Sequence, residues 1–161
     1  MDPTFGTPPG DPASDPGLAR FRRRGRWLFT ALAILTVVVA LLVLPNVPAS
    51  LPDAALVLLI LGVVLGVTVD IALVVGLSNG RPWADHATVA VCWILLVFGL
   101  TRTVLRLLGG AIDIPLDSIL AALVLSVKPA VLPPVDAGDR PWVWIIVGIT
   151  FVGAISGLAP R

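Results

Sequence analysis

The sequence predicts an all-α protein, a polytopic bundle of transmembrane helices with five spans. Of its 161 residues, 57% are hydrophobic and only 13% are charged, whereas about a quarter of the residues of a soluble domain are charged. The mean hydropathy is +1.00. The apolar residues also gather in runs of about 20, the length of helix that crosses a hydrocarbon core of about 30 Å. These observations indicate a multi-pass membrane protein rather than a soluble domain.

The amino terminus consists of a predicted disordered tail, residues 1–19, and a basic flank, residues 20–26. The tail is rich in Pro, Gly and Asp and cannot bury enough apolar surface to offset its ordering entropy. The flank, RFRRRGR, holds five arginines directly before the first apolar run. Basic residues beside a span mark the cytoplasmic side. We therefore expect a cytoplasmic N-terminus, and no nucleic acid as a partner.

The predicted bundle covers residues 27–158 and is followed by a short tail, 159–161. Its first three spans are expected over residues 27–44, 54–77 and 87–108. A cleaved signal peptide is the alternative for the first span. Its apolar run exceeds the usual signal-peptide core of about 7–15 residues, so we favour a retained helix.

The C-terminal third allows two topologies. Residues 142–158 form a clear span, whereas the apolar stretch 114–134 is interrupted by Lys128 and Pro129. If both segments cross, eight Lys and Arg residues lie on the inner side and three on the outer side. If residues 114–134 are re-entrant, the chain has four spans and these counts become seven and four. The positive-inside rule favours five spans, with the C-terminus outside.

Small residues and one acid share a face of the second span. Gly62, Gly66 and Asp70 fall within an arc of about 80°. Glycines spaced by four let two helices approach closely, so this face is expected to contact protein. Gly153 and Gly157 offer a candidate partner face in the last span. Both a dimer contact and packing within one chain would use such faces, and packing within the chain is favoured because five spans need internal contacts.

The same pattern predicts which glycines of the second span tolerate replacement. Gly76 lies near the helix end and is expected to tolerate replacement better than Gly62 or Gly66.

Four ionisable residues are expected inside the membrane or at its edge: Asp70, Lys128, Arg102 and Arg106. A lone charge at depth is costly, so Asp70 must be protonated, paired or hydrated. In the five-span topology Lys128 reaches a similar depth, and we expect the two to form an ion pair. A role in ion or proton coupling is the alternative for Asp70.

The two arginines lie near the outer end of the third span. Nearby acids (Asp53, Asp113 and Asp117) are expected to pair with them, although the arginines could also bind an anionic substrate. Cys92 and Trp93 are expected in the core, with the Trp93 N–H close to Asp70.

Few residues in the chain suggest catalysis or metal binding. The single cysteine and the single histidine exclude an internal disulfide and any Cys-rich or His-rich metal site. Ser78, Asp85 and His86 could form a hydrolytic trio, but their loop is short and offers no oxyanion donor. We therefore expect no enzymatic site and no cofactor.

The loop SNGRPWADH contains Gly80, Arg81, Trp83 and Ala84, a G-R-x-W-A pattern. In this loop the chain resembles small polytopic membrane proteins of actinobacteria that have no assigned activity. The resemblance implies a bacterial plasma-membrane protein. The expected function is that of a non-enzymatic accessory protein, which contacts itself or another membrane protein through its helices in the lipid bilayer. A small oligomeric transporter or channel that uses Asp70 is the alternative.

Overall fold

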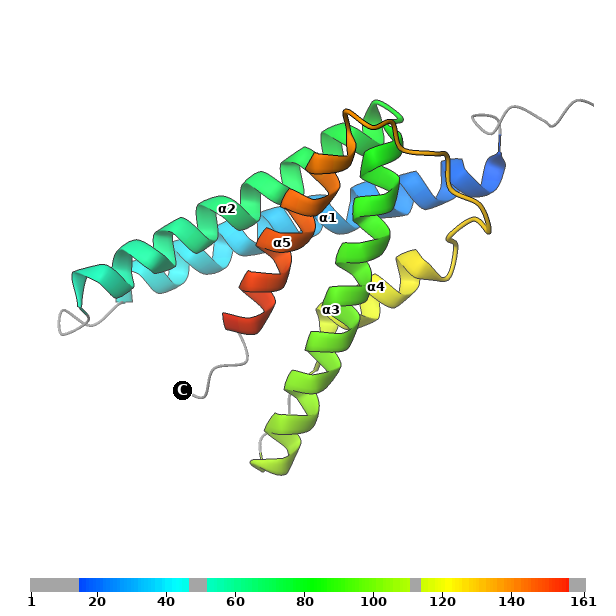
Figure 1. Ribbon diagram of the computed structural model, residues 1–161. Coiled ribbons are helices and arrows are strands. Elements are labelled where there is room, and N and C mark those ends of the chain that lie inside the picture. Colours follow the sequence, from blue (N-terminus) through cyan, green and yellow to red (C-terminus); the bar gives the residue numbers. More distant parts are fainter. Residues whose placement is uncertain (1–14, 47–51, 111–113, 157–161) are drawn as a thin grey trace, which may run out of the picture.

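The computed structural model describes residues 15–46, 52–110 and 114–156, and within these ranges it contains helices and no strands (Figure 1). This confirms the all-α prediction. The helices are α1 (Pro16–Val43), the 3-10 turn η2 (Leu44–Asn46), α2 (Asp53–Ser78), α3 (Pro82–Leu108), α4 (Leu116–Leu125) and α5 (Arg140–Ser156).

Helix α1 begins earlier than the sequence suggested. Asp15 caps it, with its Oδ1 accepting a hydrogen bond of 2.8 Å from the Gly17 N–H, and Pro16 occupies the first turn. Leu18 and Phe21 are buried against the other helices. This burial stabilises helix through residues 16–26, so the prediction of disorder is wrong for residues 16–19. The rest of the predicted tail, residues 1–14, lies outside the described residues.

The turn between α2 and α3 follows from its residue types. Gly80 has φ +66, a left-handed conformation that glycine adopts without steric cost. Pro82 then starts α3, where its missing N–H is not needed. Because the proline can begin the helix, α3 starts five residues before the predicted span.

Three of the described helices are long and apolar enough to cross a membrane. They are α1 with η2, α2 and α3, which supports a membrane protein. Helices α4 and α5 are shorter. The ten residues of α4 cover only about 15 Å, and a non-helical segment continues from Ser126 to α5. Pro129 helps to end the helix, because it has no backbone N–H and disfavours helical geometry in the residue before it.

The helices form an open, V-shaped arrangement (Figure 1). Helix α1 packs along α2, α4 packs against α3 and α1, and α5 lies between α2 and α3. The α1–α2 pair and α3 meet where α1 begins and where α2 turns into α3. We call this part of the molecule the closed end. At the opposite ends, the open end, the α1–α2 pair and α3 diverge.

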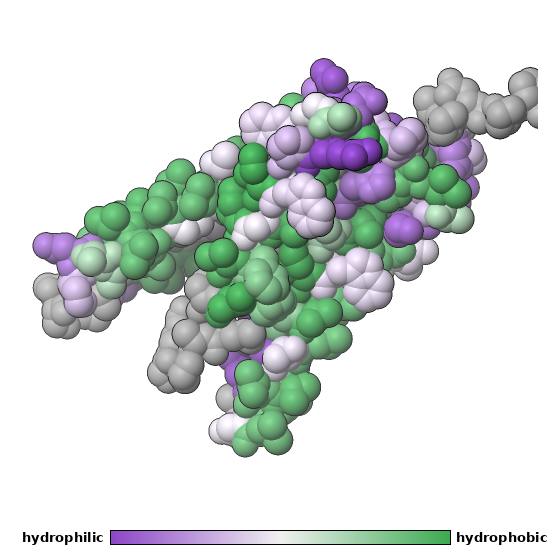
Figure 2. Space-filling model, viewed as in Figure 1, coloured by the Kyte–Doolittle hydropathy of each residue, from purple (hydrophilic) through white to green (hydrophobic). Residues whose placement is uncertain are grey.

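The buried core is concentrated in the half of the molecule next to the closed end. Its residues come from all five α-helices: Leu18, Phe21, Leu28, Phe29, Val69, Leu73, Leu77, Ala84, Ala87, Val91, Cys92, Ala121, Val124 and Ile146. Toward the open end, large apolar side chains of α1, α2 and α3 are exposed, and hydrophilic residues gather at the closed end (Figure 2). An apolar exterior of this kind suits contact with lipid or with another membrane helix.

The two residues predicted to lie together in the core have different environments. Cys92 is fully buried, as expected. Trp93 is 53% exposed, so its prediction as a core residue is wrong. Adjacent residues on a helix point about 100° apart, and only one of the two can face the core here.

Candidate functional site

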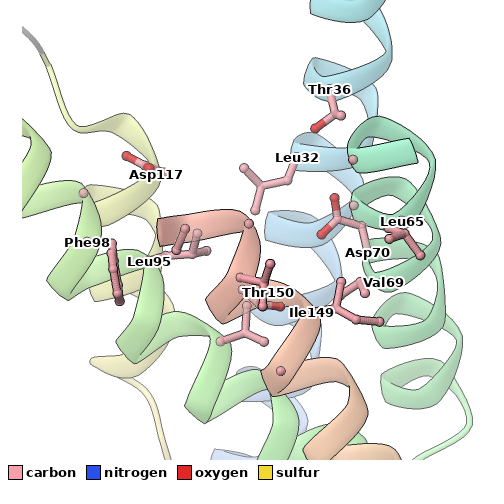
Figure 3. A pocket seen from close by; sticks show the side chains of 18 of the residues that line it. Leu32, Thr36, Leu65, Val69, Asp70, Leu95, Phe98, Asp117, Ile149 and Thr150 are labelled. Carbon is pink, nitrogen blue, oxygen red and sulfur yellow. The ribbon is translucent and has the colours of Figure 1, made fainter. Parts of the chain in front are cut away.

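The space between the diverging helices is a cleft of about 820 Å³. Helices α1 and α2 form one side of it, and α3 and α5 form the other (Figure 3). Leu, Val, Ile and Gly residues supply most of its lining, and α4 contributes Asp117. The cleft is therefore a mainly apolar groove inside the helix bundle, with few polar groups.

Glycines line the cleft on both sides. Gly62 and Gly66 come from α2, and Gly148 and Gly153 come from α5. Among the described residues, a Cβ atom added at Gly62, Gly66 or Gly148 would meet no atom within 4 Å beyond the backbone of its own helix. Helices α2 and α5 are neighbours, but the predicted close packing at Gly62 and Gly66 is wrong for the single chain, because these glycines face the cleft. Gly157 lies outside the described residues.

Other glycines provide the close helix contacts. A Cβ at Gly76 would lie 2.6 Å from the Ala84 Cβ, and one at Gly25 would lie 2.9 Å from Leu77 Cδ1. A Cβ at Gly99 would overlap the Ser118 hydroxyl of α4. The expectation that Gly76 tolerates replacement best is therefore wrong. Its neighbours Trp83 and Ala84 follow a tight turn that folds α3 back onto the end of α2, which spacing within one helix does not reveal.

Asp70 lies on the α2 side of the cleft, eight residues before the end of α2 at Ser78, or about 12 Å along the helix. Figure 3 shows its carboxyl group in the space between α2, α1 and α5, near Leu32 and Thr36. In the described part of the chain, no hydrogen bond or ion pair reaches this carboxyl group. Asp70 is half-buried and lines the cleft.

The predicted ion pair between Asp70 and Lys128 is not formed. Lys128 lies three residues beyond α4 and is exposed. Helix α4 packs against α3 and α1 instead of α2. The early end of α4 and its position behind α3 keep Lys128 away from the cleft. The Trp93 N–H, expected close to Asp70, forms no hydrogen bond with it in the described part of the chain. The hydroxyl of Ser126, next to Lys128 in the chain, bonds to Leu123 O at 2.9 Å.

A buried ion pair that the sequence analysis missed joins α1 to α3. Arg22 donates from Nε to Asp85 Oδ1 at 2.9 Å and from its terminal nitrogen to Asp85 Oδ2 at 2.6 Å. The same nitrogen donates to the Gly80 carbonyl at 3.1 Å. Asp85 is fully buried, and the Arg22 side chain is 18% exposed. The sequence feature that could have indicated this pair is the apolar stripe of Leu18, Phe21, Gly25 and Phe29. This stripe packs against the other helices, so the adjacent Arg22 also lies close to them.

The three residues considered as a hydrolytic trio bond elsewhere. Asp85 binds Arg22, and the Ser78 hydroxyl donates to Val74 O at 2.7 Å within its own helix. His86 Nε2 lies 2.9 Å from the Pro133 carbonyl. A carbonyl oxygen can only accept, so Nε2 is the donor. This bond connects the start of α3 to the segment before α5.

At the other end of the cleft, Arg102 of α3 lies 3.6 Å from Asp117 of α4. This confirms the predicted pairing of Arg102 with a nearby acid, whereas Asp113 lies outside the described residues. Arg106 is one turn further along α3 and is exposed. Along α3, Arg102 and Asp85 are 17 residues, or about 26 Å, apart. The two ion pairs thus bracket an apolar layer about as thick as a hydrocarbon core, and Asp70 lies between them.

Comparison with known proteins does not assign the chain to a family. No family model matches the chain, and neither a curated protein nor a solved structure matches it. Among the described residues, no group of three potential metal ligands occurs. The cleft and its unpaired carboxyl group are therefore the features on which a functional proposal must rest.

Proposed function

We propose that the protein is a non-enzymatic accessory protein of a bacterial plasma membrane, and that its cleft binds a transmembrane helix of another membrane protein. The observation that carries this proposal is the open position of the cleft glycines. Gly62, Gly66 and Gly148 line an apolar groove, and a Cβ atom added at any of them would meet no atom of the described residues within 4 Å beyond the backbone of its own helix.

Helix packing gives the physical reason. Membrane helices associate through close van der Waals contact, and small residues allow the two backbones to approach. Folded proteins usually fill such contacts at the density of an organic crystal. Here the buried side chains are concentrated in the closed half of the bundle, and the cleft lies between the helices toward the open end. A helix from a partner would contact the glycine faces of α2 and α5 and complete the packing.

The proposed topology has five crossings, with the N-terminus in the cytoplasm and the closed end on the cytoplasmic side. Two observations support it. The basic flank, Arg81 and Arg140 all lie toward the closed end. The bond from His86 to Pro133 brings the segment after α4 back to the start of α3. The fourth crossing then consists of α4 and the start of this segment.

Site-specific crosslinking in the native cells tests the proposal. A photoreactive amino acid replaces Leu61, which lines the cleft. The matched control replaces Val64, which lies on the same helix, is 54% exposed and does not line the cleft. We expect Leu61 to give one discrete protein adduct whose crosslinked peptide maps to a transmembrane segment, and Val64 to give none. Lipid adducts alone at both positions would contradict the proposal.

A small transporter or channel is the second candidate, and one observation favours it. Asp70 and the Arg102–Asp117 pair line the same cleft at different depths, so polar groups mark a route into the apolar layer. Purified protein in liposomes, with a pH-sensitive dye inside and an imposed membrane potential, tests this function. Proton entry that is lost on Asp70→Asn would favour it, and no flux above empty liposomes would exclude proton conduction.

A further inference from the structure

We propose that the helix bound in the cleft carries a basic side chain, Lys or Arg, near the middle of the membrane, and that this side chain forms an ion pair with Asp70. The inference rests on the proposed function, because it names the chemistry of the same partner. It starts from a carboxyl group that lines the cleft and that forms no hydrogen bond or ion pair in the described part of the chain.

The depth of Asp70 makes a partner necessary. It is about 12 Å from the end of α2 at the closed end and about 7 Å from the midpoint of the helix. At this depth, a lone charge must be neutralised, paired or hydrated. The cleft offers little hydration, because most of its lining is apolar. A Lys or Arg side chain on the bound helix would neutralise the carboxylate. The carboxylate would in turn stabilise this cation inside the membrane.

The described residues around Asp70 do not supply this charge. Among the side chains labelled around Asp70 in Figure 3, Leu32 and Thr36 come from α1 and Ile149 and Thr150 come from α5, and none of these four is charged. Thr150 donates its hydroxyl to Ile146 O at 2.9 Å within α5. The cleft's cation, Arg102, pairs with Asp117. Measured along the helices from the closed end, it lies about 18 Å further out than Asp70.

The shape of the cleft favours a helix as the carrier of the cation. On α2, glycines line the cleft over about two turns from Asp70 toward the open end, and α5 contributes Gly148 and Gly153. Such glycines admit the backbone of another helix. A lipid acyl chain could fill the apolar groove, but it has no donor for the carboxyl group. A basic residue on a helix is held at a fixed depth. One helix can therefore pack against the glycine faces and pair with Asp70.

The test uses the full-length protein in phosphatidylcholine liposomes with synthetic helices as probes. Each probe has about 20 Leu and Ala residues, with Lys, Gln or Leu at the centre. Placing the residue centrally lets it reach the level of Asp70 in either orientation of the probe. Energy transfer from a dye at the amino terminus of the protein to a dye on the probe reports binding. The variants are Asp70→Asn, with Asp53→Asn as its control at the helix end, and Gly66→Leu, with Val64→Leu as its control outside the cleft.

We expect the Lys probe to bind about tenfold more tightly than the Leu probe, the effect of one strong interhelical polar contact. Asp70→Asn should abolish this preference and leave binding of the Leu probe unchanged, which also shows that the variant is folded. Asp53→Asn should keep the preference. Gly66→Leu should weaken binding of every probe, whereas Val64→Leu should not.

The outcomes separate the inference from the proposed function. If all three probes bind equally and Gly66→Leu weakens them all, the cleft binds helices but the basic partner is wrong. If the Gln probe binds as tightly as the Lys probe, the contact is a neutral hydrogen bond and the ion pair is overturned. If no probe binds and Leu61 gives no protein adduct in cells, both proposals fail.

Discussion

Arg22 and Asp85 form a more enclosed contact than the other described ion pair, Arg102–Asp117. Because Asp85 is fully buried, removing either partner leaves a charge without compensation. We predict that Asp85→Ala lowers the free energy of unfolding by about 3–5 kcal/mol. Replacing both residues, as Arg22→Met with Asp85→Leu, should cost much less. Unfolding of the detergent-solubilised protein in increasing dodecyl sulfate measures these differences.

A neighbouring arginine provides the control for this pair. Arg23 follows Arg22 in the same flank but is exposed, so Arg23→Ala should change the free energy of unfolding by less than about 0.5 kcal/mol. If Arg22→Ala and Arg23→Ala had equal effects, the basic flank would act only as a positively charged segment. The ion pair would then contribute nothing to the fold.

The glycines provide a second prediction at the residue scale. Gly99→Ala places a Cβ atom on the Ser118 hydroxyl, and Gly76→Ala places one against Ala84. Overpacking of this kind costs about 1–3 kcal/mol. Gly66→Ala adds a methyl group in the open cleft and should change stability by less than about 1 kcal/mol. The same unfolding assay tests this order, and a larger loss at Gly66 than at Gly99 would show that the cleft is closed in the folded protein.

Sequence reasoning at the residue scale succeeded where the partners are local and failed where they are distant. The pairing of Arg102 with Asp117 follows from two helix ends joined by a short loop. The pairing of Arg22 with Asp85 joins residues that are 63 positions apart, and it depends on how α1 crosses the α2–α3 turn. Spacing by four identified Gly62 and Gly66 as small residues on one face. It could not show whether a helix of the same chain covers that face.

At the scale of elements, the long helices were predictable and the segment after α3 was not. An apolar run of about 20 residues defines a span by length alone. Residues 114–134 mix apolar side chains with Lys128 and several prolines, so the same composition suits a crossing or a re-entrant segment. The structure resolves the local question: α4 ends at Leu125, and the chain continues without helix to α5.

His86 holds this non-helical segment near α3. Its Nε2–H bond to the Pro133 carbonyl joins parts of the chain that are 47 residues apart. We predict that His86→Ala speeds amide hydrogen exchange about fivefold at residues 130–132 and at Val135, the effect of losing one hydrogen bond of about 1 kcal/mol. Exchange within α3 should not change. Ser78→Ala is the control, because the Ser78 hydroxyl bonds only within its own helix, and equal effects of both variants would contradict the role of His86.

At the scale of the whole molecule, composition indicates a membrane protein, but it cannot show how the helices pack. The chain buries its core in one half and leaves apolar side chains exposed in the other. In a bilayer this costs little, because lipid tails are as apolar as the side chains that they contact. No pattern in the sequence therefore requires the open end to close within one chain. The cleft became visible only from the relative positions of α1, α2, α3 and α5.

The topology gives the last prediction. Reporter fusions after Gly110, Val135 and Arg161 should read outside, inside and outside, because α3 ends at the open end and Pro133 returns to the closed end. Fusions after Asn46 and Asn79, at the ends of η2 and α2, serve as controls and should read outside and inside. Five crossings place eight of the eleven basic residues in the cytoplasm. A fusion at Val135 that reads outside, together with one at Arg161 that reads inside, would show that residues 114–134 double back. The bond between His86 and Pro133 could not then form across the membrane, and the chain would have four spans.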